Sequence, residues 1–203
     1  MPTSRSYHDA CPIARGLDVV GERWALLVVR ELLLGPQRFS DLRHALPGVS
    51  SNLLTDRLRE LSAHGVVARR RLPPPAGSVV YDLTAAGRDL EPVLIAIGEW
   101  GMRLPRPDAA SLSATSVLLY LRGSRAGEHE ATYCIELDGR PWTVTTGGGR
   151  VRVESGEPAA PVARLRTDPH TLNALLADPA LLDRDSVDGD PAAIRELLRP
   201  QAG

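Results

Sequence analysis

The chain of 203 residues contains no lysine, so all 24 of its basic side chains are arginines. A catalytic lysine, or the phosphate-binding lysine of a P-loop, is therefore excluded. The two cysteines, Cys11 and Cys134, are too few for a disulfide framework and lack the paired Cys/His spacing of a zinc site. The abundance of Ala, Arg, Gly and Pro suggests a GC-rich bacterial genome.

Long apolar runs are also absent. The best uncharged apolar stretches, residues 25–29 and 92–98, fall far short of the ~18 residues that a membrane span needs. The first twelve residues, MPTSRSYHDACP, lack the continuous apolar segment of a secretory signal. We therefore expect a cytoplasmic protein with no membrane partner.

Signatures of enzyme active sites are missing as well. Residues 147–149 are three glycines, but no Gly-Lys-Ser/Thr follows, so a hairpin turn is a better interpretation than a P-loop. No Gly-x-Ser-x-Gly occurs, and the five histidines have no paired spacing. The sequence predicts no enzyme activity, no metal and no cofactor.

The net charge of −1 hides a local excess of positive charge. Residues 38–71 carry seven arginines against three acidic side chains, whereas residues 106–203 carry 11 arginines against 14 acidic ones. A basic patch on a nearly neutral chain is typical of a surface that binds phosphates. A solvated charged face is the alternative.

Three helices are predicted in the first third of the chain. Residues 22–34 are apolar on most sides and stop at Gly35-Pro36, which is typical of a buried central helix. A short helix follows with Ser40 as its N-cap, and Pro47-Gly48 ends it. A third helix extends from Ser50/Ser51 to residue 64. Two such helices joined by a tight turn form a helix-turn-helix candidate.

A β-hairpin is predicted directly after these helices. Residues 66–72 and 79–83 are β-branched runs on either side of a Pro/Gly-rich turn, and a hairpin in this place is a wing. Thr84 can cap the next helix and Pro92 can restart it. The apolar stripe over residues 90–104 is larger than a small domain needs for its own core, so we assign part of it to a dimer interface.

The third helix carries residue types that read DNA. Leucines 54, 58 and 61 form its core stripe, and Asn52, Asp56 and Arg59 lie opposite. Asn can bond adenine, Arg can bond guanine, and a Thr methyl can meet that of thymine, while the first turn suits a phosphate. A solvated helix face is the alternative. The predicted DNA contacts are Arg38, Ser40, Ser50, Ser51, Asn52, Thr55, Arg57, Arg59, Arg69, Arg70, Arg71 and Ser78.

Residues 11–104 resemble the HxlR-type branch of winged-helix bacterial regulators. The shared features occur in order: Cys11-Pro12, Gly21-Glu22-Arg23-Trp24, Gly35-Pro36-Gln37-Arg38-Phe39, Leu54-Thr55-x-Arg57-Leu58-x-Glu60-Leu61, Tyr81-x-Leu83-Thr84-x-x-Gly87 and Trp100. The resemblance implies a homodimer built from the first and last helices. It also implies a third helix in the major groove of an inverted-repeat operator and a wing near the minor groove.

The sequence departs from this family at Asn52, where lysine is common, and this leaves its base preference open. Some HxlR-type members use an N-terminal cysteine as a thiol sensor, so Cys11 is a candidate redox thiol. A packed or idle thiol is the alternative reading of Cys11.

The pattern changes after a Pro-flanked linker at residues 103–107. Residues 113–122 can be a helix or a strand, and residues 132–137, 142–145, 151–153 and 163–166 alternate like strands. Asp168-Pro169 and Asp190-Pro191 each open a helix, with Asp at the N-cap and Pro after it. The overall fold class is therefore α+β: a winged helix-turn-helix over residues 1–105, then a small α+β domain over residues 106–203 with an antiparallel sheet.

Residues 111–199 resemble the sterol-carrier-protein fold, through the segments 133–153, 165–176 and 187–198. The resemblance implies a cavity between sheet and helices for an apolar small molecule, and a plain core is the alternative for each residue. The expected function is a DNA-binding regulator modulated by that molecule. The rival is a lipid-binding or protein-interaction module whose helix-turn-helix serves only dimerisation. The predicted cavity lining is Tyr133, Ile135, Trp142, Val144, Leu172, Leu176 and Leu181.

Overall fold

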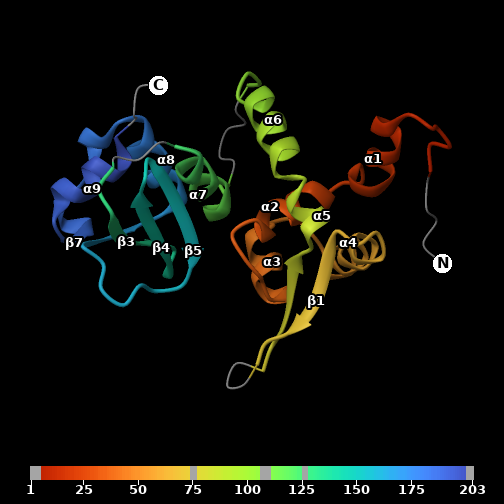
Figure 1. Ribbon diagram of the computed structural model, residues 1–203, viewed down its shortest axis with the longest axis horizontal. Helices are drawn as coiled ribbons and strands as arrows, with labels where there is room; N and C mark the ends of the chain where they lie inside the picture. Colours follow the sequence, from red (N-terminus) through yellow and green to blue (C-terminus); the bar gives the residue numbers. More distant parts are fainter. Residues whose placement is uncertain (1–5, 74–76, 106–110, 125–127, 200–203) are drawn as a thin grey trace. The chain divides into compact units, whose positions relative to one another are not determined.

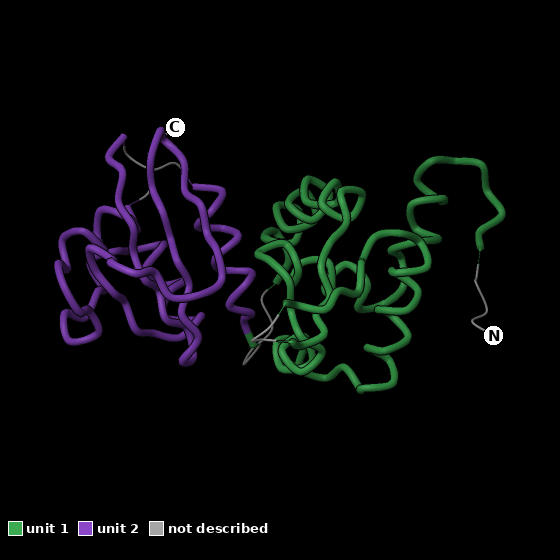
Figure 2. Tube along the Cα trace, turned by 60° about the horizontal axis from the view of Figure 1, so that its bottom comes forward, with its two compact units in different colours: residues 1–111 green, residues 112–203 purple. Residues whose placement is uncertain are grey.

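A computed structural model describes residues 6–73, 77–105, 111–124 and 128–199 of the chain. The chain divides into two compact units, unit 1 over residues 1–111 and unit 2 over residues 112–203 (Figure 2). The middle of the predicted wing turn and part of the predicted linker lie outside the described residues. The mixed α+β fold class and the helix-turn-helix in the first half are confirmed.

Unit 1 is a helical domain with a two-stranded hairpin (Figure 1). Apolar side chains of α2, α3 and α4 form its core together with residues from the base of the hairpin. The helices and strands in chain order are α1 (Pro12–Val20), α2 (Ala25–Leu32), α3 (Phe39–Ala45), α4 (Ser51–Ala63), β1 (Val67–Arg71), β2 (Val79–Leu83), α5 (Ala85–Arg88) and α6 (Glu91–Gly101).

Two helix starts in unit 1 differ from the sequence-based prediction. The central helix α2 begins at Ala25 and not at residue 22, because Trp24 has a left-handed backbone with φ of 78° that interrupts the helical path. Helix α3 begins at Phe39 with Arg38 as its N-cap, so the prediction of Ser40 as N-cap is wrong. The Asp41 carboxylate accepts a hydrogen bond from the Arg38 amide at 3.3 Å, and this places the cap two residues earlier.

The predicted helix α4 and the wing are present. The Ser50 hydroxyl accepts a hydrogen bond from the Leu53 amide at 3.3 Å and caps α4. Strands β1 and β2 pair antiparallel, with Val67 opposite Leu83. Gln37, between α2 and α3, exchanges two backbone hydrogen bonds with Tyr81 and fastens the hairpin to the helices.

Unit 2 is a five-stranded sheet with helices packed against it (Figure 1). The strand order is β5-β4-β3-β6-β7, and α7 and α9 contact the sheet while α8 contacts α7. The elements are α7 (Ala114–Gly123), β3 (Ala131–Leu137), β4 (Arg140–Gly147), β5 (Arg150–Ser155), β6 (Ala163–Thr167), α8 (Pro169–Ala177), the 3₁₀ turns η1 (Pro179–Leu181) and η2 (Arg184–Ser186), β7 (Val187–Gly189) and α9 (Pro191–Leu198).

The sheet is mixed, so the prediction of an antiparallel sheet is wrong. Strand β6 pairs parallel to β3, with Ile135 opposite Leu165. The parallel pairing arises from the connection over residues 156–162. This connection crosses from the edge strand β5 to the far side of β3, so that β6 runs in the same direction as β3. The Thr143 hydroxyl, which donates to the Gly156 carbonyl at 3.0 Å, holds the start of this connection beside β4.

Within the described residues, no helix is long and apolar enough to cross a membrane. The same residues contain no group of three or more His, Cys, Asp or Glu side chains placed to hold a metal ion.

Candidate nucleic-acid interface

The surface of α4 presents a polar face opposite its buried leucines. Asn52, Thr55 and Arg59 are exposed, and Leu54, Leu58 and Leu61 are fully buried. Arg59 is 60% exposed and pairs with Asp56 at 2.8 Å, an exposed i,i+3 pair that is worth little in water. Arg59 can therefore exchange Asp56 for a base edge or a phosphate at low cost.

The first turn of α4 offers backbone donors. Ser50 caps the helix through the Leu53 amide, and the Thr55 hydroxyl donates to the Ser51 carbonyl at 2.8 Å. Amides at a helix N-terminus, with the positive end of the helix dipole, suit a phosphate. Arg38 and Ser40, at the start of α3, are also exposed.

Arg57 is a correction to the predicted contacts. Only 11% of its side chain is exposed, and its guanidinium lies 2.7 Å from Glu60 and 3.8 Å from Glu22, which precedes α2. The position lies three residues after the buried Leu54, on the inward side of the helix, so Arg57 is placed to stabilise the domain and is poorly exposed for a DNA contact. Its neighbour two residues later, Arg59, is on the outward side.

The three consecutive arginines of the wing are all exposed, but they differ in their partners. Arg70 forms an ion pair with Asp82 of β2, and Arg69 and Arg71 have no ion pair with the described residues. Ser78 is a second correction, because its hydroxyl oxygen is buried and has no hydrogen-bond partner among the described residues.

Sequence reasoning missed two charged residues of this surface. The Asp82 carboxylate also pairs with Arg88 of α5 at 3.1 Å, and Asp82 is one of the few charged side chains that the structure buries. The only sequence signal for Asp82 was an acidic residue among the apolar residues of a predicted strand. This signal does not reveal that Arg70 and Arg88 are its partners.

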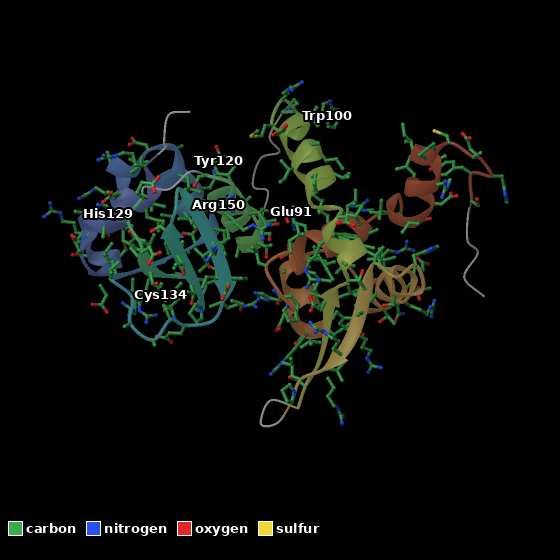
Figure 3. The ribbon with its side chains drawn as sticks, in the orientation of Figure 1. Glu91, Trp100, Tyr120, His129, Cys134 and Arg150 are labelled. Carbon is green, nitrogen blue, oxygen red and sulfur yellow. The ribbon has the colours of Figure 1, made fainter. Side chains whose placement is uncertain are left out.

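Helices α1 and α6 leave apolar side chains in water. Neither helix has a fully buried residue in the single chain. Trp100, near the C-terminal end of α6 (Figure 3), is 59% exposed. An apolar surface of this kind is typical of a protein interface. The exposed apolar residues of the two helices and their flanks are Tyr7, Ile13, Leu17, Val93, Ile95, Ile97, Trp100, Met102 and Leu104.

Cys11 is exposed at the N-cap of α1, and Cys134 is buried in β3 (Figure 3). Hydrogen bonds from the backbone amides of Ala14 and Ile13 lower the pKa of the Cys11 thiol. Burial raises the pKa of the Cys134 thiol, although Arg164 donates a hydrogen bond to its sulfur at 3.1 Å.

Unit 2 places most of the predicted lining residues inside the protein. Tyr133, Ile135, Trp142, Val144 and Leu172 are buried and Leu176 is half-buried. Leu181 is 63% exposed, so its inclusion in the lining is wrong. The 3₁₀ turn η1 directs the next residue, Leu182, into the core instead.

Two polar atoms stand out among these side chains. The indole nitrogen of Trp142 is buried and has no hydrogen-bond partner among the described residues. Burial raises the pKa of the Tyr133 hydroxyl, and the negative charges of Glu196 and Asp190 add to the effect. Buried polar atoms normally have partners, so the Trp142 nitrogen is an unusual feature of this unit.

Comparison with known proteins locates the likeness in the first half of the chain. Residues 19–108 match the family described as HxlR-like helix-turn-helix. The chain is 45% identical over 91 residues to the HTH-type transcriptional regulator sll1512 of Synechocystis sp., covering 45% of this chain and 67% of the relative. It is 40% identical over 93 residues to the HTH-type transcriptional regulator YvaP of Bacillus subtilis, covering 45% of this chain and 86% of the relative.

A solved structure of the redox regulator HypR in its oxidized form is 35% identical to this chain. It matches with a TM-score of 0.45, covering 48% of this chain and 100% of that one. The matched relatives are named as transcriptional regulators and not as enzymes.

Proposed function

Because the chain belongs to the HxlR-like helix-turn-helix family, we propose that it is a sequence-specific regulator that binds double-stranded DNA as a homodimer. One observation carries the proposal. Asn52, Thr55 and Arg59 project from the exposed side of α4, while the opposite side of this helix is fixed in the leucine core of unit 1. A rigid helix with base-reading side chains on its free face is the arrangement that fits a major groove.

The remaining proposed contacts divide by role. Ser50, Ser51 and the amides of the first turn of α4 bind a phosphate, and so do Arg38 and Ser40 at the start of α3. Arg69 and Arg71 of the wing bind phosphates on the flank. Contacts to phosphates set the position of the protein on the duplex, and Asn52, Thr55 and Arg59 supply the sequence preference.

The apolar surface of α1 and α6 supports the homodimer. These side chains are exposed in the single chain, and a second copy is the occupant that the family implies. A two-fold dimer presents two copies of α4, so the operator is an inverted repeat with half-sites about one helical turn, roughly 34 Å, apart.

Binding to duplex DNA at two salt concentrations tests the function. We expect a mixed-sequence duplex to bind with a dissociation constant of roughly 10⁻⁴–10⁻⁶ M near physiological salt and more tightly at low salt. Selection from a random-sequence pool is expected to yield an inverted repeat. Absence of duplex binding at low salt would show that the helix-turn-helix serves only dimerisation.

We further propose that unit 2 has the sterol-carrier-protein fold and binds an apolar small molecule that modulates DNA binding. The buried indole nitrogen of Trp142 supports this, because a ligand with one hydrogen-bond acceptor would satisfy it. A thermal-shift screen of hydrophobic metabolites, with Trp142→Phe as the control that keeps an aromatic side chain and lacks the N–H donor, identifies such a ligand. If no compound raises the melting temperature, unit 2 is a structural or protein-contact module.

A regulatory ligand must favour one dimer geometry over another. We expect it to change operator affinity by about 5–150-fold, the range typical of coupled sites. Replacing residues 104–107 with a long Gly/Ser segment is expected to leave DNA binding intact and to erase the ligand effect. An equal ligand effect in both proteins would exclude the linker as the route of coupling.

A further inference from the structure

Asp82 joins two parts of unit 1 that are not adjacent in sequence. Its side chain is only 3% exposed. One carboxylate oxygen pairs with the guanidinium of Arg70 on β1, and the other lies 3.1 Å from the guanidinium of Arg88 at the end of α5. The outgoing strand of the wing is thereby fastened to the helix that follows the returning strand.

The register of the hairpin separates the three wing arginines into two sets. Ala68 lies opposite Asp82, and Arg70 lies opposite Val80. Because successive residues of a strand point to opposite faces, Arg70 and Asp82 share one face of the hairpin, and Arg69 and Arg71 lie on the other.

The face of Arg69 and Arg71 is the one that packs toward α4 at the base of the hairpin. Val67 and Leu83, which share this face, pack in the core with the leucines of α4. The face of Arg70 is the reverse side. A duplex that meets α4 is therefore approached by Arg69 and Arg71.

We propose that Asp82 is a positioning residue for DNA binding, and that together with Arg88 it holds Arg70 on the reverse face of the wing. The wing then contacts the phosphate backbone through Arg69 and Arg71 and not through Arg70. A nearly buried carboxylate is destabilised when a partner is removed, so Arg70 stays with Asp82 when DNA binds. This inference rests on the proposed function of the chain and replaces the expectation that Arg70 binds a phosphate.

The salt dependence of binding distinguishes the two roles. The full chain and its variants are titrated with a mixed-sequence duplex over a series of salt concentrations. Each phosphate contact that is lost flattens the slope of log K against log salt by about 0.9. We expect Arg69→Ala and Arg71→Ala each to flatten the slope. Arg70→Ala is expected to keep the wild-type slope and to weaken binding by the same factor at every salt concentration, because the wing is less well fixed.

Asp82→Asn is expected to keep the wild-type slope and to weaken binding at least as much as Arg70→Ala, because it also weakens the pair with Arg88. The double variant is expected to bind no more weakly than Asp82→Asn, because Arg70 has already lost its partner in that single variant. Asp89→Asn, at an exposed position next to Arg88, is the control for Asp82→Asn. It makes the same change in net charge and leaves the Arg70–Asp82 ion pair in place. Arg70→Lys retains a cation near Asp82 and is expected to restore affinity.

A flattened slope in Arg70→Ala, equal to that of Arg69→Ala, would overturn the inference and make Arg70 a phosphate contact. Additive losses in melting temperature for Arg70→Ala and Asp82→Asn would also overturn it, by showing that the two residues do not act together. If the wild-type chain binds no duplex at low salt, the proposed function itself fails, and that outcome is separate from both of these.

Discussion

Arg57 and Glu60 form an ion pair within α4, with a guanidinium nitrogen 2.7 Å from a carboxylate oxygen. The pair lies on the side of the helix that faces Glu22, and the Nε atom of Arg57 is buried without a hydrogen-bond partner among the described residues. Helix α4 thus carries two arginines in different surroundings. Arg57 pairs with acidic residues on the inner side of the helix, and Arg59 is largely exposed and pairs with Asp56.

Arg57 is expected to contribute to stability and not to DNA contacts. Arg57→Ala removes the buried stem and the ion pair and is expected to lower the free energy of unfolding by about 1–3 kcal/mol. Arg57→Met keeps most of the packing and is expected to cost less. Urea denaturation measures both. The salt slope of DNA binding is expected to stay at the wild-type value in Arg57→Met, and a flatter slope would assign a phosphate contact to Arg57.

Asn52 and Arg59 are expected to set base preference. Replacing either with alanine is expected to weaken binding to the selected operator by about 1–3 kcal/mol and to relax the preference at one base pair of each half-site. Competition with all single base-pair variants of the operator measures this. Arg43→Ala, an exposed arginine of α3 outside the proposed contacts, is the control for loss of charge. Unchanged preference in both α4 variants would mean that α4 is not the reading helix.

The apolar surface of α6 is expected to be the dimer interface. Trp100→Glu places a charge in a surface that a second copy buries, so we expect the dimer to dissociate into monomers. Light scattering on the full chain reports the mass. Tyr120→Glu, at an exposed aromatic residue of α7, is the matched control and is expected to leave the dimer intact. Residues 1–105 alone are expected to form a dimer, and a monomer there would move the interface to unit 2.

The two cysteines are expected to react at very different rates. Because backbone amides lower the pKa of Cys11, its thiolate forms at a lower pH than that of an ordinary thiol. Modification by a disulfide reagent is measured against pH in Cys134→Ser, which leaves Cys11, and in Cys11→Ser, which leaves Cys134. The first protein is expected to react quickly, and the second only after unfolding, since Cys134 is buried. Equal rates in the native proteins would contradict the placement of both thiols.

Asp168, the N-cap of α8, is expected to make stability depend on pH. The Thr171 hydroxyl, followed by the backbone amides of Thr171 and His170, lowers the pKa of its carboxyl group. A carboxyl whose pKa is lower in the folded state stabilises the protein above its unfolded pKa, and this contribution is lost as the pH falls through the folded pKa.

Two variants separate the cap from its charge. Asp168→Ala is expected to cost about 0.5–2 kcal/mol at neutral pH. Asp168→Asn keeps the cap and is expected to be close to wild type at low pH, with less gain in stability as the pH rises. Thermal unfolding between acidic and neutral pH measures both variants. An identical pH dependence in wild type and Asp168→Asn would remove Asp168 as its source.

Local patterns in the sequence determined most of the elements. The spacing of the leucines on α4 predicts a helix with one buried stripe, and the structure buries Leu54, Leu58 and Leu61. The Asp-Pro pairs predict the starts of α8 and α9, because an Asp N-cap and a Pro in the first turn act within a few residues of chain. The wing and the break before α6 follow from equally local signals.

Only the tertiary structure decided which side chains meet. The inward position of Arg57 follows from its spacing to Leu54, but its proximity to Glu22, which is distant along the chain, depends on how α4 packs against the segment before α2. The pairing of Arg70 with Asp82 depends on the register of the hairpin, and the parallel pairing of β6 with β3 depends on the path of the connection before it. Periodicity and capping act over a few residues, whereas ion pairs and strand order depend on which distant segments pack together, and no short stretch of sequence contains that information.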